Sequence, residues 1–158
     1  MAQPPEHEIN DDAIYRVTIA TDRGTIVMEL DPQLAPNTVN NFVGLARRGY
    51  YDNLAFHRVV PEFVIQGGDP EGTGRGGPGY QFADEPVRGD YTLGAVAMAN
   101  AGPDTNGSQF FVCIDDCTTK LQKNYNLFGY VVDGIDVAQE TQVGDVMQSV
   151  RVEETPRD

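Results

Sequence analysis

Short apolar segments separated by turn residues recur along most of this chain, and this recurrence most constrains its fold. The segments are Tyr15–Ala20, Thr25–Leu30, Ala55–Val60, Phe63–Gln66, Ala95–Met98, Gln109–Cys113, Leu127–Val132 and Met147–Val152. Runs this short are typical of β-strands, and 17 Gly and 10 Pro supply turns between them. The sequence therefore predicts eight strands.

The spacing of the apolar residues predicts one β-hairpin and two helices. Tyr15, Val17 and Ile19 alternate with other residues, and the same alternation resumes after the turn at 22–24, which predicts a β-hairpin with one buried face. From Pro36 the apolar residues follow a helical period that ends before Gly49, and a weaker helical stretch spans residues 135–141. We expect a mainly β fold, an eight-stranded antiparallel closed barrel capped by two α-helices.

The length of the chain predicts one domain, and the composition of its first residues predicts a tail. The chain of 158 residues suits a single core, which we place at 14–158, and the polar, acidic residues 1–13 are expected to form a flexible tail. Those first residues lack the basic and apolar regions of a signal peptide, and no apolar run approaches the roughly 20 residues that span a bilayer. The expected location is the cytoplasm.

Charge and cysteine content exclude several classes of function. A formal net charge of −13 repels polyanions, which argues against nonspecific binding to nucleic acid or anionic membranes. Cys113 and Cys117 are too few for a disulfide framework. A metal site built on them would need His7 or His57, the chain's two histidines, so we expect no metal.

The Gly-rich segment 72–79 contains a dinucleotide-binding pattern in the wrong context. Gly72, Gly74 and Gly77 satisfy G-x-G-x-x-G, but Pro78 and Gly79 follow where a phosphate-binding loop would begin a helix. The glycines are better explained by a surface loop that turns sharply. A nucleotide-binding enzyme remains an alternative that saturable dinucleotide binding would reveal.

Polar residues interrupt two of the predicted strands. Arg58 and Gln66 stand within the otherwise apolar stretch 56–69, where alternation alone favours a solvent-facing Arg58. A second stretch, 98–112, places Asn100 and Gln109 around a tight loop, and their amides suit binding of a peptide backbone. By alternation, only one ring of the pair 110–111 faces the core.

These two stretches resemble the FHR…F…QGGD and MANAG…NGSQFF segments of the cyclophilin family, and the resemblance extends from about Tyr15 to Glu153. It implies an eight-stranded barrel with peptidyl-prolyl cis-trans isomerase activity, which needs no cofactor. By matching positions, it implies Arg58 as the catalytic residue. The implied substrate-binding residues are His57, Phe63, Val64, Gln66, Ala99, Asn100, Gln109, Phe111, Leu121 and Tyr125.

Four positions depart from the common family pattern. Tyr125 stands where many members have histidine, Val64 where many have methionine, and Glu62 where glycine is usual. Lys120 replaces the tryptophan linked to tight cyclosporin binding, and the chain contains no Trp. We expect catalysis to survive, because tyrosine offers an apolar ring and a hydroxyl, whereas cyclosporin affinity is expected to be reduced.

The expected partners are proline-containing peptides and folding proteins, bound by a monomer. The main alternative is a binding module with the same barrel that holds proline-containing segments without catalysing rotation. An isomerisation assay on a short X–Pro peptide separates the two, because pure binding leaves the rate unchanged or slower.

Overall fold

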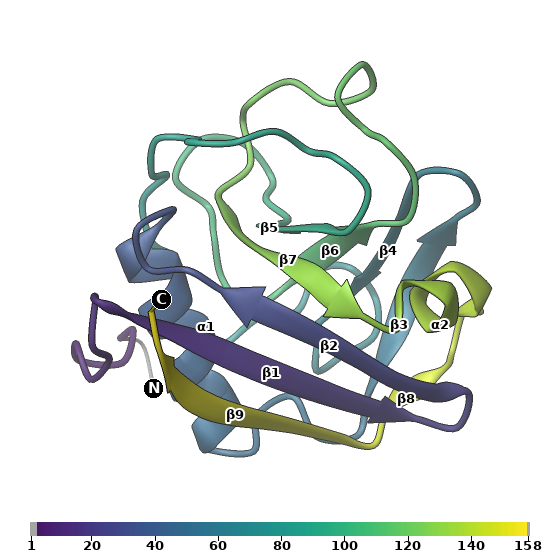
Figure 1. Cartoon of the computed structure of the whole chain (residues 1–158), viewed down its shortest axis with the longest axis horizontal. Coiled ribbons are helices and arrows are strands. Elements are labelled where there is room, and N and C mark those ends of the chain that lie inside the picture. The colour runs from purple at the N-terminus through teal and green to yellow at the C-terminus, as the bar shows by residue number, and fades with distance from the viewer. Residues whose placement is uncertain (1–2, 158) are drawn as a thin grey trace.

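A computed structural model describes residues 3–157, which form nine strands and two helices (Figure 1). The elements are β1 (Ala13–Thr21), β2 (Gly24–Leu30), α1 (Pro36–Arg47), β3 (Leu54–Val60), β4 (Val64–Gly67), β5 (Ala95–Met98), β6 (Phe110–Cys113), β7 (Leu127–Asp133), α2 (Ile135–Glu140), β8 (Val146–Met147) and β9 (Ser149–Pro156). Neither helix within residues 3–157 has the length and apolar composition of a membrane span.

The strands form one antiparallel sheet in the order β8-β3-β4-β6-β5-β7-β2-β1-β9. Only Gln148 separates β8 from β9, so the two ends of this order meet and the sheet curves into a nearly closed barrel (Figure 1). The prediction of eight strands was therefore one short. A single strand was expected at Met147–Val152, but the chain changes partner there, pairing with β3 through β8 and with β1 through β9.

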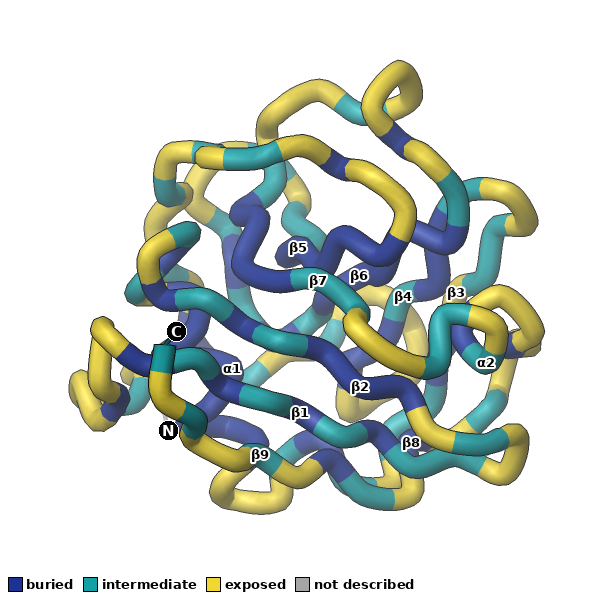
Figure 2. Tube along the Cα trace, viewed as in Figure 1, coloured by how far each residue is buried: buried dark blue, intermediate teal, exposed yellow. Residues whose placement is uncertain are grey.

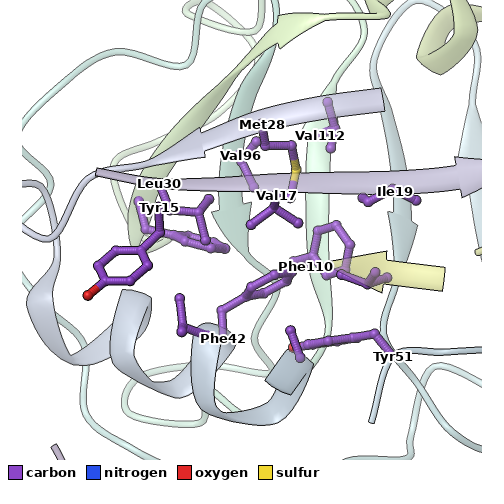
Figure 3. Close-up of a cluster of buried hydrophobic side chains, with 14 of the residues drawn as sticks. Tyr15, Val17, Ile19, Met28, Leu30, Phe42, Tyr51, Val96, Phe110 and Val112 are labelled. Atoms are coloured by element: carbon purple, nitrogen blue, oxygen red, sulfur yellow. The ribbon is translucent and has the colours of Figure 1, made fainter. Parts of the chain in front are cut away.

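The barrel interior is filled by apolar side chains, and Figure 2 shows β1 alternating between buried and intermediate positions along its length. Tyr15, Val17 and Ile19 of β1 are fully buried, which confirms the predicted buried face of the hairpin. Helix α1 covers one end of the barrel with Phe42, whose ring stacks on Tyr51 at 4.6 Å between centroids. Figure 3 shows these two rings close to Phe110 of β6.

The N-terminus of α1 is capped by a distant residue. Ala35 occupies the position before the helix and has no side-chain hydrogen bond to offer. Instead, the Glu85 carboxylate accepts hydrogen bonds from the main-chain amides of Asn37 and Thr38 and from the Thr38 hydroxyl. A negative charge at a helix N-terminus is favourable, so this contact also holds the segment after the Gly-rich loop against α1.

The segment before β1 contacts α1. The Asn40 side chain donates to the Pro5 and Glu6 carbonyls, and the Glu8 carboxylate pairs with Arg47 and Arg48 at 3.2 and 3.1 Å. These contacts do not measure motion, so the predicted flexibility of residues 1–13 stays a prediction. Residues 1 and 2 lie outside the described part of the chain.

Candidate active site

Alternation along β6 creates a second apolar cluster outside the barrel. Phe110 points into the barrel interior, so the next side chain, Phe111, must point to the opposite face of the sheet. There it is 4% exposed and meets Tyr125 edge-on, with 5.5 Å between ring centroids. Val64 of β4 is buried in the same cluster, and Phe63 and Leu121 pack against it.

This cluster forms the floor of a cavity of about 540 Å³. The lining residues are His57, Arg58, Phe63, Val64, Gln66, Thr73, Gly74, Ala99, Asn100, Phe111, Leu121 and Tyr125. Ten of the eleven candidate site residues thus line one cavity, although they come from segments far apart in the sequence. Their roles stay predictions, because position alone does not test them.

The eleventh candidate, Gln109, lines a neighbouring cavity of about 880 Å³. The two cavities share Gln66, Gly74, Ala99 and Asn100, so they adjoin. Together they offer room for a short extended peptide, with the apolar cavity at one end.

A chain of hydrogen bonds runs along the polar side of the site. The exposed Arg58 guanidinium donates to Gln66 Oε1 at 3.2 Å, and strand pairing places these residues opposite each other. Gln66 Nε2 donates to Gln109 Oε1 at 3.0 Å, and Gln109 Nε2 donates to the Gly76 carbonyl at 3.0 Å. Among the described residues, no carboxylate lies within ion-pair distance of Arg58, so its charge faces the cavity without compensation.

His57 lies beneath the Gly-rich loop at the edge of the cavity. Both of its ring nitrogens are buried, and neither has a hydrogen-bond partner among the described residues. A Cβ placed on Gly74 would lie 3.9 Å from His57 Nε2, so this loop passes directly over the ring. The arrangement suits a residue that shapes the wall.

Sequence reasoning missed the contribution of this loop. Thr73 and Gly74 line the apolar cavity, and Arg75 lines its neighbour, whereas the segment was interpreted only as a surface turn. The sharp turns themselves are confirmed by φ angles of 70° at Gly72 and 89° at Gly74. The usable signal was Asp69, an acidic residue just before the Gly-rich segment, whose carboxylate can accept hydrogen bonds from the amides that follow it.

Two of the departures from the family pattern contact each other. Glu62 adopts the left-handed conformation, with φ 62°, which explains why glycine is the easier residue there. Lys120 Nζ donates to the Glu62 carbonyl at 2.5 Å and lies 3.6 Å from Asp115. Lys120 is thus held at the turn between β3 and β4, next in sequence to Leu121, which lines the cavity.

Both cysteines are free and buried beside the site. Burial raises the pKa of the Cys113 thiol well above its usual value, and a contact with Cys117 adds to this effect. The pKa of Cys117 is also raised by burial, and its thiol donates weakly to the Phe63 carbonyl at 3.4 Å. Thiols in this state are poor nucleophiles and poor metal ligands at neutral pH.

Comparisons with known proteins agree with one another. A sequence profile described as cyclophilin type peptidyl-prolyl cis-trans isomerase/CLD matches residues 16–157. The chain is 48% identical to peptidyl-prolyl cis-trans isomerase B of Bacillus subtilis over 134 residues, covering 84% of this chain and 93% of that protein. It is 52% identical to human peptidyl-prolyl cis-trans isomerase-like 1 over 124 residues, covering 75% of this chain and 74% of the relative.

Solved structures give the same result. A Cryptosporidium parvum cyclophilin type peptidyl-prolyl cis-trans isomerase superposes with a TM-score of 0.82 at 32% identity, covering 90% of this chain and 99% of the other. A second structure of that protein was determined in the presence of the dipeptide Ala-Pro and superposes with a TM-score of 0.74, at the same identity and coverage.

Proposed function

The chain belongs to the cyclophilin-type peptidyl-prolyl cis-trans isomerase family and is a peptidyl-prolyl cis-trans isomerase, and we propose that Arg58 catalyses the rotation of the X–Pro bond. The observation that carries this proposal is an uncompensated guanidinium beside a cavity whose floor is an apolar, partly aromatic cluster. Phe63, Phe111 and Leu121 would bury the proline ring, with Val64 and Tyr125 at its margins.

The reaction breaks no covalent bond, so the site has to stabilise a twisted amide. Resonance makes the rotation barrier about 18–20 kcal/mol, and uncatalysed rotation takes roughly tens to hundreds of seconds. A turnover near 10³ per second would require lowering that barrier by about 6–7 kcal/mol. Interactions that strengthen only in the twisted state supply such a difference.

Arg58 has the right chemistry for this task. Twisting localises the lone pair on the proline nitrogen, and a cationic donor aimed at that nitrogen, or at the displaced carbonyl oxygen, favours the twisted state. A guanidinium is always charged and offers several donors in a planar fork, which lysine lacks. Burying the proline ring meanwhile holds one side of the bond while the other side turns.

The main chain of the 99–100 segment is proposed to hold the flanking peptide. Side-chain binding by Asn100 was expected, but its Nδ2 donates to the Asn124 carbonyl and its Oδ1 accepts from the Gly102 amide. The Ala99 amide is also engaged, donating to the Gln109 carbonyl at 3.0 Å. We therefore assign peptide binding here to the remaining main-chain groups, in strand fashion.

An exchange experiment tests the proposed function against the binding-module alternative. NMR exchange spectroscopy on a short X–Pro peptide measures the interconversion of cis and trans forms directly. We expect substoichiometric protein to accelerate the exchange far above the uncatalysed rate. Peptide binding with no acceleration would instead establish a module that holds proline-containing segments.

Cyclosporin affinity is proposed to be limited by Lys120. Its charged side chain is exposed and bonded to the Glu62 carbonyl, whereas an indole would offer a flat apolar surface at the rim. We expect Lys120→Trp to tighten cyclosporin binding roughly tenfold, about 1.4 kcal/mol, as measured by isothermal titration calorimetry. Lys123→Trp is the control, since Lys123 pairs with Asp90, whereas Lys120 bonds to the Glu62 carbonyl in the turn before Phe63. Equal affinities for Lys120→Trp and the parent would contradict the assignment.

We further propose that the protein acts as a monomer in the cytoplasm on folding proteins that contain proline. A net charge of −13 opposes self-association, and light scattering at the mass of one chain, 17.3 kDa, would support this. Two free thiols suit a reducing compartment, and fractionation of cells tests the location.

A further inference from the structure

The Gly-rich loop is organised around one buried carboxylate. Asp69, at the end of the QGGD segment, is 1% exposed. Its oxygens accept hydrogen bonds from the main-chain amides of Glu71 at 2.8 Å, Thr73 at 2.9 Å and Gly74 at 2.5 Å. Burial tends to raise the pKa of this carboxyl, but the amide hydrogen bonds outweigh burial and lower it. Asp69 is thus an ionised clamp that draws the loop around itself.

Gly76 packs directly against this clamp. A Cβ at position 76 would lie 1.9 Å from Asp69 Oδ1, far inside any allowed contact, so the main chain approaches the carboxylate as closely as only glycine permits. At the next residue, Gly77, a Cβ would meet nothing within 4 Å. Asp69 therefore sets the position of the Gly76 main chain in particular.

The Gly76 carbonyl in turn fixes which way round the side-chain amides of Gln109 and Gln66 lie, that is, which end of each donates and which accepts. A carbonyl oxygen can only accept, so Gln109 must turn its Nε2 toward Gly76 and its Oε1 toward Gln66. Gln66 must then donate from Nε2, which leaves its Oε1 to accept from Arg58. If the Gln66 amide turned over, its NH₂ group would face the guanidinium, and if the Gln109 amide turned over, its NH₂ group would face the Gln66 NH₂ group.

We propose that Asp69 is a positioning residue for the isomerisation, because it holds the Gly76 carbonyl that orients Gln109 and Gln66 and thereby aims Arg58. This inference rests on the proposed catalytic role of Arg58. The clamped loop contributes Thr73 and Gly74 to the cavity wall, whereas the side chains proposed to bury the proline ring come from other segments: Phe63 before β4, Phe111 on β6 and Leu121 in the loop after it. We therefore expect releasing the clamp to change the catalytic step more than peptide binding.

Two variants release the clamp in different ways. Asp69→Asn removes the charge and replaces one acceptor oxygen with a donor, whereas Gly76→Ala forces the main chain away from the carboxylate. We expect each to lower kcat on an X–Pro peptide roughly ten- to hundredfold, because small displacements of a catalytic group are costly, with KM changed less than about twofold. Gly77→Ala is the matched control and is expected to lower kcat much less than Gly76→Ala. NMR exchange at several peptide concentrations separates kcat from KM.

A double variant and a spectroscopic probe distinguish positioning from general loosening. Asp69→Asn combined with Gln109→Leu should lower kcat no further than the stronger single variant, because both break the same chain. The Arg58 Nε–H resonance should shift in Asp69→Asn and stay in place in Gly77→Ala. Additive losses, an unmoved Arg58 signal, or parental kcat in Asp69→Asn and Gly76→Ala would overturn the inference while leaving the role of Arg58 intact. Parental activity in Arg58→Ala would instead remove the proposed function and this inference together.

Discussion

Replacing Arg58 with alanine is expected to lower kcat/KM for an X–Pro peptide by about 10²–10³-fold, the usual effect of removing one donor aimed at transition-state charge. In the proposed mechanism, the guanidinium is the cation beside the turning bond, and the described residues place no carboxylate against it. A protease-coupled or NMR exchange assay measures the loss.

The fold should survive this change. Arg58 is exposed on β3, and its side chain bonds only to Gln66 among the described residues, so thermal unfolding is expected to shift little. Arg58→Lys retains the charge without the planar fork and should recover only part of the activity. Equal rates for Arg58→Ala and the parent protein would remove Arg58 from the mechanism.

Phe111→Ala is expected to weaken both peptide binding and turnover, because it empties the floor of the apolar cavity. Phe111 is 4% exposed and contacts the rings of Tyr91 and Tyr125, so truncation also costs about 3–5 kcal/mol in the free energy of unfolding. That is a large share of the roughly 5–15 kcal/mol that stabilises a domain. The milder Phe111→Leu is therefore the variant for kinetics, with KM for an X–Pro peptide expected to rise roughly tenfold.

The neighbouring residue supplies a matched control. Phe110 stands next to Phe111 on the same strand, but it packs inside the barrel against Phe42 and Tyr51. Phe110→Leu should destabilise the fold to a similar extent and leave KM near the parental value. If both leucine variants change KM equally, the effect comes from lost stability and the proline ring is bound elsewhere.

The hairpin and the two helices were predictable because each depends on a local period. Pro36 and Gly49 predicted the limits of α1 to within a few residues, and alternation correctly divided Phe110 from Phe111. The same rule placed Arg58 on an outward face, which is correct, yet it could not tell whether that face was bare surface or the wall of a cavity. The family resemblance supplied that distinction.

Other features depend on residues that meet only after folding. Glu85 caps α1 although it follows Thr38 by 47 residues in the sequence, and no local pattern marks it as a cap. The division of the last strand at Gln148 depends on which partner strands lie at the point where the barrel closes. One donor and one acceptor of the Asn100 amide are engaged within its own loop, an arrangement that no local pattern announces, and its expected binding of peptide stays a prediction.

Local sequence patterns were enough to predict which side chains alternate between barrel interior and outer face, roughly where the helices begin and end, and which segments carry the isomerase signature. The alignment of Arg58, Gln66, Gln109 and the Gly76 carbonyl, and the contact of Asp69 with Gly76, arise only once the chain has folded. The physical reason is the range of the interactions. Periodicity and capping act over a few residues, whereas this hydrogen-bond chain needs β3, β4, the residue that precedes β6 and the Gly-rich loop to be brought together by closure of the barrel.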